Sequence, residues 1–168
     1  MFFKDQRGFT TVEAMCVIVI LAVVIVGVLD IYTKGILFWD KGEQSAEVKD
    51  NLRIGLDRMS RELRQAKQLT ANTTSKSATN DILEFINYDN TTVRYEVIGS
   101  SLKRRAGYGN FEPLSNYING SGGLRIECYP PGDGNPISAT LVKLTLSGCT
   151  GLTDTYSLST SVRLRKPK

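Results

Sequence analysis

The stretch "QRGFTTVEAMCVIVILAVVIVGVL", residues 6–29, decides how this chain folds, because it joins one carboxylate to a long apolar run. Glu13 is the only charged residue between Gly8 and Leu29. The eleven Val, Ile and Leu residues after it favour membrane insertion by roughly −3 to −7 kcal/mol in sum, whereas the carboxylate costs roughly +3 kcal/mol. The run is therefore expected to insert as a helix, and Glu13 needs a partner there.

The residues before this run form a short basic leader. "MFFKDQRG", residues 1–8, carries Lys4 and Arg7 against Asp5, and this charge balance keeps the leader in the cytoplasm. No small-residue cleavage site follows the apolar run, which argues against an ordinary secretory signal. A plain signal-anchor fits the same charges but leaves Glu13 unexplained. The predicted protein crosses the cytoplasmic (inner) membrane once, with its N-terminus in the cytoplasm and its globular domain outside.

A second helical pattern follows the apolar run without a break. No proline occurs between Phe9 and Leu69. Apolar residues spaced by three or four positions mark one helix face, and they are Val48, Leu52, Leu56, Met59, Leu63 and Ala66. The sequence predicts a transmembrane part at residues 9–29 and an amphipathic part at residues 30–69 of one long helix.

The apolar pattern changes to a period of two after the polar segment 70–81, which is typical of strands. The expected strands are 82–89 and 91–99, forming a hairpin, then 101–108, 124–129, 140–149 and 156–165, with a loop over 109–123. Residues 70–168 are thus expected to form a β-sheet globular domain. The predicted fold class is α+β, a long N-terminal helix packed on an antiparallel β-sheet.

The chain contains three cysteines, and two of them lie in the expected globular domain. Cys128 and Cys149 are the candidates for a disulfide, as expected for a domain exported to an oxidising compartment. Two unlinked buried thiols remain the alternative. Cys16 lies within the apolar run.

The N-terminal residues resemble the signature of type IV pilins and type II secretion pseudopilins. Gly8, then Phe9, then Glu13 four residues later, with an apolar helix behind them, carry this resemblance. It implies that a prepilin peptidase cleaves after Gly8 and methylates Phe9, the new N-terminal residue. It also implies that Glu13 meets the N-terminal amine of a neighbouring subunit in a filament. Glu13 could instead reach toward the lipid headgroups in the unassembled membrane pool.

The rest of the chain resembles particular members of that family, on looser patterns. Segments 58–69 and 83–97 and the closing "YSLSTSVRLR" are similar to J-type minor pseudopilins and PilW-like minor pilins. The long helix also lacks the proline that major pilins usually carry. This resemblance implies a structural subunit that primes or caps a type IV pilus or a type II secretion pseudopilus. Its partners would be other pilin or pseudopilin subunits and an inner-membrane assembly platform, and its final location an extracytoplasmic filament.

Other kinds of chemistry find little support in the residues. The chain has no histidine, no P-loop and no GxGxxG motif, so we expect neither an enzyme nor a cofactor. Asp133 and Asn135 supply too few oxygen ligands to predict a calcium site.

A basic cluster on the third expected strand leaves one alternative function open. Lys103, Arg104 and Arg105 precede Tyr108 and Phe111, a mixture that suits single-stranded nucleic acid. A solvated strand end explains the same residues more simply, so a nucleic-acid partner is unlikely on the sequence. The alternative reading is a DNA-binding or surface-binding minor pilin at a filament tip.

Overall fold

The computed structural model describes residues 10–74, 80–129, 136–150 and 155–164. It consists of two compact units, Met1–Gly42 and Glu43–Lys168. The elements in chain order are α1 (Thr11–Arg64), β1 (Ala66–Leu69), β2 (Leu83–Asn87), β3 (Thr92–Ile98), β4 (Ser101–Ala106), β5 (Glu112–Ser115), β6 (Leu124–Tyr129), the short 3-10 helix η1 (Pro136–Ser138), β7 (Leu141–Gly148) and β8 (Tyr156–Arg163).

Apart from Thr10, helix α1 accounts for the whole described part of the first unit. The residues from Thr11 to Gly42 are all solvent-exposed, although most of those before Asp30 are apolar. Among the described residues, α1 is long and apolar enough to cross a membrane. An apolar surface of this extent is unfavourable in water, so this part of α1 fits a membrane anchor.

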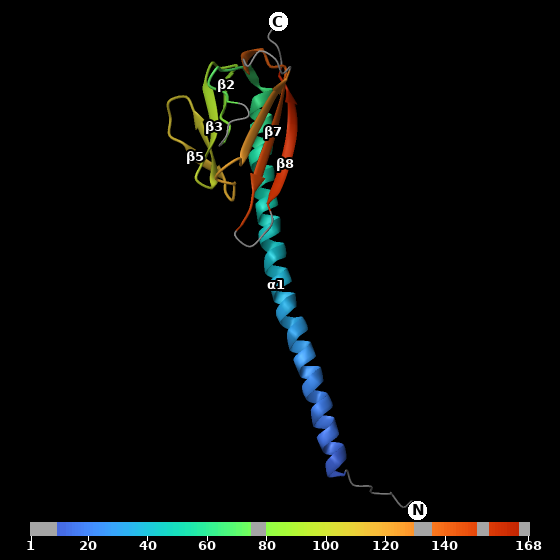
Figure 1. The fold of residues 1–168 in the computed structure, drawn as a ribbon. Coiled ribbons are helices and arrows are strands. Elements are labelled where there is room, and N and C mark those ends of the chain that lie inside the picture. The colour runs from blue at the N-terminus through green and yellow to red at the C-terminus, as the bar shows by residue number, and fades with distance from the viewer. Residues whose placement is uncertain (1–9, 75–79, 130–135, 151–154, 165–168) are drawn as a thin grey trace, which may run out of the picture. The chain divides into compact units, whose positions relative to one another are not determined.

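The second unit contains two antiparallel sheets and the end of α1 (Figure 1). One sheet has the strand order β1-β2-β3-β4-β5, and the other has the order β6-β7-β8. Every strand pair is antiparallel, which short connections between neighbouring strands permit. The predicted α+β class, a long N-terminal helix packed on an antiparallel β-sheet domain, is confirmed.

The core of this unit lies between α1 and the two sheets. The predicted helical stripe is buried, and Val48, Leu52, Met59 and Leu63 are fully shielded from solvent. Gly55 lies on the same face, where an added Cβ would stand 3.0 Å from a methyl of Leu146 and 3.1 Å from one of Leu102. The two leucines come from β7 and β4, so the missing side chain of Gly55 lets α1 approach both sheets.

The helix ends earlier than the sequence predicted. It ends at Arg64 and not near Leu69, because Ala66–Leu69 form β1, which pairs with β2. Ala66 and Leu69 are fully buried in this strand, with two exposed residues between them. The apolar spacing that fits a helix also fits this short strand with its register shift, and pairing with β2 decides between them.

The expected loop over residues 109–123 contains one more strand. Strand β5 pairs with β4, so that Ser115 lies opposite Leu102 and Pro113 opposite Lys103. A proline is tolerated here because β5 is the edge strand of its sheet.

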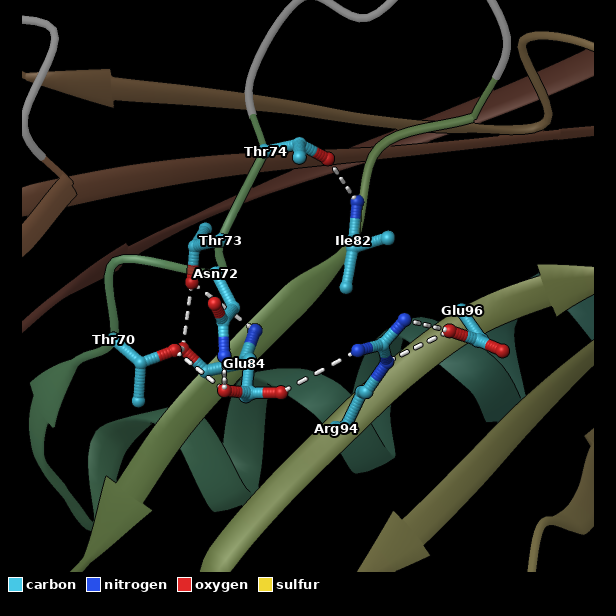
Figure 2. Close-up of polar contacts among 8 residues, drawn as sticks. All are labelled: Thr70, Asn72, Thr73, Thr74, Ile82, Glu84, Arg94 and Glu96. Carbon is cyan, nitrogen blue, oxygen red and sulfur yellow. Dashed lines mark hydrogen bonds and ion pairs between the residues drawn. The ribbon is translucent and has the colours of Figure 1, made fainter.

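A buried carboxylate anchors the segment between β1 and β2. The Glu84 side chain accepts hydrogen bonds from the Thr70 hydroxyl at 2.9 Å and the Asn72 amide at 2.8 Å, as Figure 2 shows. The Thr73 hydroxyl donates to the Glu84 carbonyl at 2.6 Å, and Arg94 lies 3.6 Å from the carboxylate. Because the Glu84 carboxylate is surrounded by donors in this way, it holds the polar segment against the sheet.

Candidate processing and assembly site

The first turn of α1 is organised around Thr10. The Thr10 hydroxyl accepts a hydrogen bond from the Glu13 backbone N–H at 3.2 Å, and the Thr10 carbonyl accepts one from Ala14 N–H at 3.1 Å. Thr10 is therefore the N-cap of the helix that begins at Thr11. Glu13 occupies the third helical position, where its negative charge favours the positive end of the helix dipole.

The Glu13 side chain is exposed and carries no ion pair with any residue that the structure describes. Its apolar neighbours Val12 and Met15 are 70% and 65% exposed. The carboxylate is thus free to meet a cation from outside the chain. Gly8 and Phe9, the predicted cleavage site and new N-terminus, lie outside the described residues.

The first charges after the apolar run neutralise each other. Lys34 Nζ lies 2.7 Å from Asp30 Oδ2, one helical turn away, and both side chains are more than half exposed. Pairing of this kind adds little stability in water. It leaves Glu13 as the one charge without an ion-pair partner among the described residues before Asp40.

The predicted basic cluster on β4 is divided by the geometry of the strand. Neighbouring side chains point to opposite faces of a sheet. Arg104 points toward α1, where its Nε donates to both carboxylate oxygens of Glu62 at 3.0 and 3.1 Å. Arg105 lies over the Phe111 ring at 4.8 Å, and Lys103 stands opposite Glu96 on β3. The structure therefore does not bring Lys103, Arg104 and Arg105 together as one basic surface.

Glu62 and Arg104 form a partly buried ion pair between the end of α1 and the first sheet. Their side chains are 15% and 20% exposed, and Arg58 adds a hydrogen bond to Glu62 at 3.0 Å. Burial alone would raise the pKa of Glu62. The hydrogen bonds from the two arginines outweigh burial and hold that pKa below its ordinary value of 4.5.

The outer face of the same sheet carries paired charges. Arg94 donates from Nε to Glu96 Oε2 at 2.7 Å, and its Nη2 also contacts Glu96. Its Nη1 lies 3.6 Å from Glu84 Oε2, so one cation serves two carboxylates (Figure 2). Glu84 on β2 lies opposite Arg94 on β3, and Glu96 lies two positions further along β3. In the structure, Arg94 lies between them and takes up their charge.

The predicted bridge between Cys128 and Cys149 is wrong for this structure, in which both are free thiols. Cys128 pairs with Val142 in the register of β6 and β7, whereas Cys149 follows the opposite end of β7. The seven residues from Val142 to Cys149 correspond to roughly 23 Å of extended chain, far beyond the roughly 7 Å that a disulfide allows. Cys149 instead donates to Asn119 Oδ1 at 3.1 Å.

Metal ligation has no support in the described part of the chain. Across residues 10–74, 80–129, 136–150 and 155–164, no group of three or more Cys, Asp or Glu side chains could hold a metal ion. Asp133 and Asn135, the weak calcium candidates, lie outside those residues.

Two features of the site were missed in the sequence. Thr10 and Glu13 form the Thr-x-x-Glu pattern of a helix capping box, which can be read directly from the residues. The pair of Glu62 with Arg104 is separated by 42 positions, and no local pattern predicts it. Only the packing of α1 on the sheet brings these two residues together.

The comparisons with known proteins point to the same N-terminal region. Residues 3–29 match the family model described as the prokaryotic N-terminal methylation motif. No curated protein matches the chain. The motif is a type IV pilin-like prepilin signal, and it implies processing by a prepilin peptidase and assembly with other pilins. Residues 3–29 thus carry a prepilin-type methylation motif, and the helix that begins within this motif fits a membrane anchor.

Proposed function

We propose that this protein is a minor pilin or pseudopilin, a structural subunit that primes or caps the assembly of a type IV pilus or a type II secretion pseudopilus. The observation that carries the proposal is the methylation motif over residues 3–29. It includes the start of α1, where exposed apolar residues surround Glu13, a carboxylate without an ion pair among the described residues. Removal of residues 1–8 would create an amine at Phe9. In an assembly, that amine is the natural counter-ion for Glu13 of a neighbouring subunit.

The protein acts in this proposal as a substrate of the prepilin peptidase and as a building block. It has no catalytic role. The alternative of a DNA-binding tip subunit loses its main support, because Arg104 is engaged by Glu62 and Arg105 by Phe111.

Cross-linking to partner subunits tests the role of Glu13. The Glu13→Gln variant should insert at least as well as the wild type, since it removes an insertion cost of roughly 3 kcal/mol. It leaves a neighbour's amine unpaired in a low-dielectric bundle, and breaking one side of a buried pair costs about 3–5 kcal/mol. We therefore expect much weaker cross-linking to other pilin-like subunits at equal membrane levels.

Glu112→Gln is the matched control, because Glu112 is an exposed carboxylate on β5 without an ion pair among the described residues. Undiminished cross-linking of Glu13→Gln would leave Glu13 with a headgroup contact only and would count against the proposed assembly role.

A further inference from the structure

The exposed edges of the two sheets differ in how they are protected. An unpaired edge offers free backbone groups to a strand from another chain, and proteins normally block it. Strands β1 and β5 have only four residues each, and β1 carries a register shift while β5 contains Pro113. Both of these edges are poor templates for another strand.

The edge at β6 is covered by side chains from the segment before β2. Asn80 Oδ1 accepts hydrogen bonds from the backbone of Gly123 at 2.8 Å and Leu124 at 3.2 Å. Asp81 accepts one from Ile126 N–H at 2.6 Å and donates its own N–H to the Leu124 carbonyl. On the side of β6 that faces away from β7, the N–H groups of Leu124 and Ile126 and the carbonyl of Leu124 are thus already paired.

Strand β8 has none of these protections. It is eight residues long, pairs with β7 in an unbroken register, and contains neither proline nor lysine. Its outward side chains include the small, uncharged Ser157, Ser159 and Ser161, all exposed. Among the described strands, β8 is therefore the regular edge most open to another strand.

The register also shows which backbone groups of β8 are free. Leu164 N–H donates to the Thr140 carbonyl at 2.9 Å, in line with the β7–β8 pairing. The N–H and C=O groups of successive residues point to opposite edges of a strand. Those of the even-numbered residues of β8 therefore point toward β7, and those of the odd-numbered residues point toward the open edge. Ser157, Ser159 and Ser161 therefore point their N–H and C=O groups away from the sheet.

A groove runs beside this edge and has room for the side chains of an added strand. Its volume is about 440 Å³, and α1 and β8 line it together. Leu56 and Leu158 provide its apolar surface, and Leu158 is 37% exposed. An added strand would bury this remaining apolar surface.

The charges in the groove specify the partner further. Lys49, Asp50, Arg53 and Asp57 of α1 line it, so basic and acidic side chains alternate along the groove. Lys49 lies over the Tyr156 ring at 4.5 Å, and Arg53 and Asp57 make no ion pair within the described part of the chain. A complementary segment carries an acidic residue facing Arg53 and a basic residue facing Asp57.

We propose that β8 is a docking edge for an extended segment of another pilin-like subunit, which pairs with it as a fourth strand and fills the groove against α1. This inference rests on the proposed function, because it takes the partner from the same assembly. It adds the surface through which the globular domain recognises its neighbour.

Photo-cross-linking of the full chain in cells with its native pilin-like subunits tests this docking edge. A photoreactive residue replaces Ser157, and in a control chain it replaces Tyr108, which is fully exposed elsewhere. We expect an adduct from position 157, and not from position 108, with a second protein that mass spectrometry identifies by its own prepilin signal.

Variants at Ser159 then separate backbone pairing from simple proximity. Ser159→Pro removes one outward N–H without touching the pairing with β7, and Ser159→Ala retains that N–H. Losing one main-chain hydrogen bond and the close approach should lower the adduct yield about tenfold in Ser159→Pro and leave it unchanged in Ser159→Ala. Ser159→Lys, which places a charge on the edge, should act like proline if the proline variant unfolds.

Undiminished adducts in both Ser159→Pro and Ser159→Lys would overturn the proposal, as would adducts with a second copy of this chain alone. Processing at Phe9 and the effect of Glu13→Gln are measured in the same cells. If these hold while the β8 adduct fails, the docking edge is wrong and the proposed function stands.

Discussion

At the scale of single residues, two glutamates of α1 lie in opposite surroundings. Glu13 is exposed beside apolar side chains and has no cation within the described residues, whereas Glu62 is held by Arg58 and Arg104. A carboxylate with its partners in place stabilises the fold, and one without a partner is available to another molecule. In the proposed function Glu13 therefore serves assembly, whereas the contacts of Glu62 serve folding.

Replacing Arg104 tests the folding role. Arg104→Met leaves the partly buried Glu62 with only the half-exposed Arg58, so we expect a loss of about 1–3 kcal/mol in the free energy of unfolding. Lys103→Met, on the other face of β4, should change it by at most about 0.5 kcal/mol. Urea unfolding of the full chain in detergent measures both, and equal effects would refute the inward role of Arg104.

The pH dependence of stability follows from the same pair. The pKa of Glu62 is lower in the folded chain than its ordinary value of 4.5, so the pair's contribution is present above that value. It is lost as the pH falls through the folded pKa. Between about pH 6 and about pH 3, the wild type should lose more stability than Glu62→Gln. Parallel losses in the two proteins would show that Glu62 does not govern this range.

At the scale of elements, strand register determines whether Cys128 and Cys149 can form a disulfide. Cys128 lies opposite Val142, and Cys149 lies beyond the far end of β7. Protein recovered without reductant and then unfolded should therefore be alkylated at both positions. Native alkylation of Cys128 should be slow, because burial and the charge of Asp81 raise the pKa of its thiol. A linked Cys128–Cys149 peptide would contradict this register.

The elements that the sequence predicted correctly are those with a strong local period. The stripe from Val48 to Leu63 is the buried face of α1, and the alternation over Tyr156–Arg163 is that of β8. The predictions that failed concern features that depend on partners distant in the sequence. Strand β1 exists because β2 pairs with it, β5 because β4 does, and the cysteine pairing required a register that neither strand carries in its own sequence.

The residues of the candidate site also fall into those that the sequence could predict and those that required the fold. Glu13 could be identified from sequence because one charge in an apolar run has a cost that local composition reveals. The separation of Lys103 and Arg105 from Arg104 follows from strand alternation once β4 is recognised. The pairing of Arg104 with Glu62 requires the packing of α1 on the sheet, and it could not be predicted.

At the scale of the whole molecule, the two units supply different parts of the proposed subunit. The first supplies an apolar helix with one carboxylate, and the second supplies a globular domain with one open strand edge. Assembly in this account requires the leader to be removed, because only then does Phe9 carry an amine at the start of the helix.

Mass spectrometry of the N-terminal peptide of membrane-extracted protein tests this account most directly. It predicts a mature chain that begins at Phe9 with one methyl group on its amine. It also predicts that Gly8→Leu abolishes the cut, while Asp5→Asn in the same leader does not. A mature N-terminus at Met1, or one beyond Leu29, would contradict it.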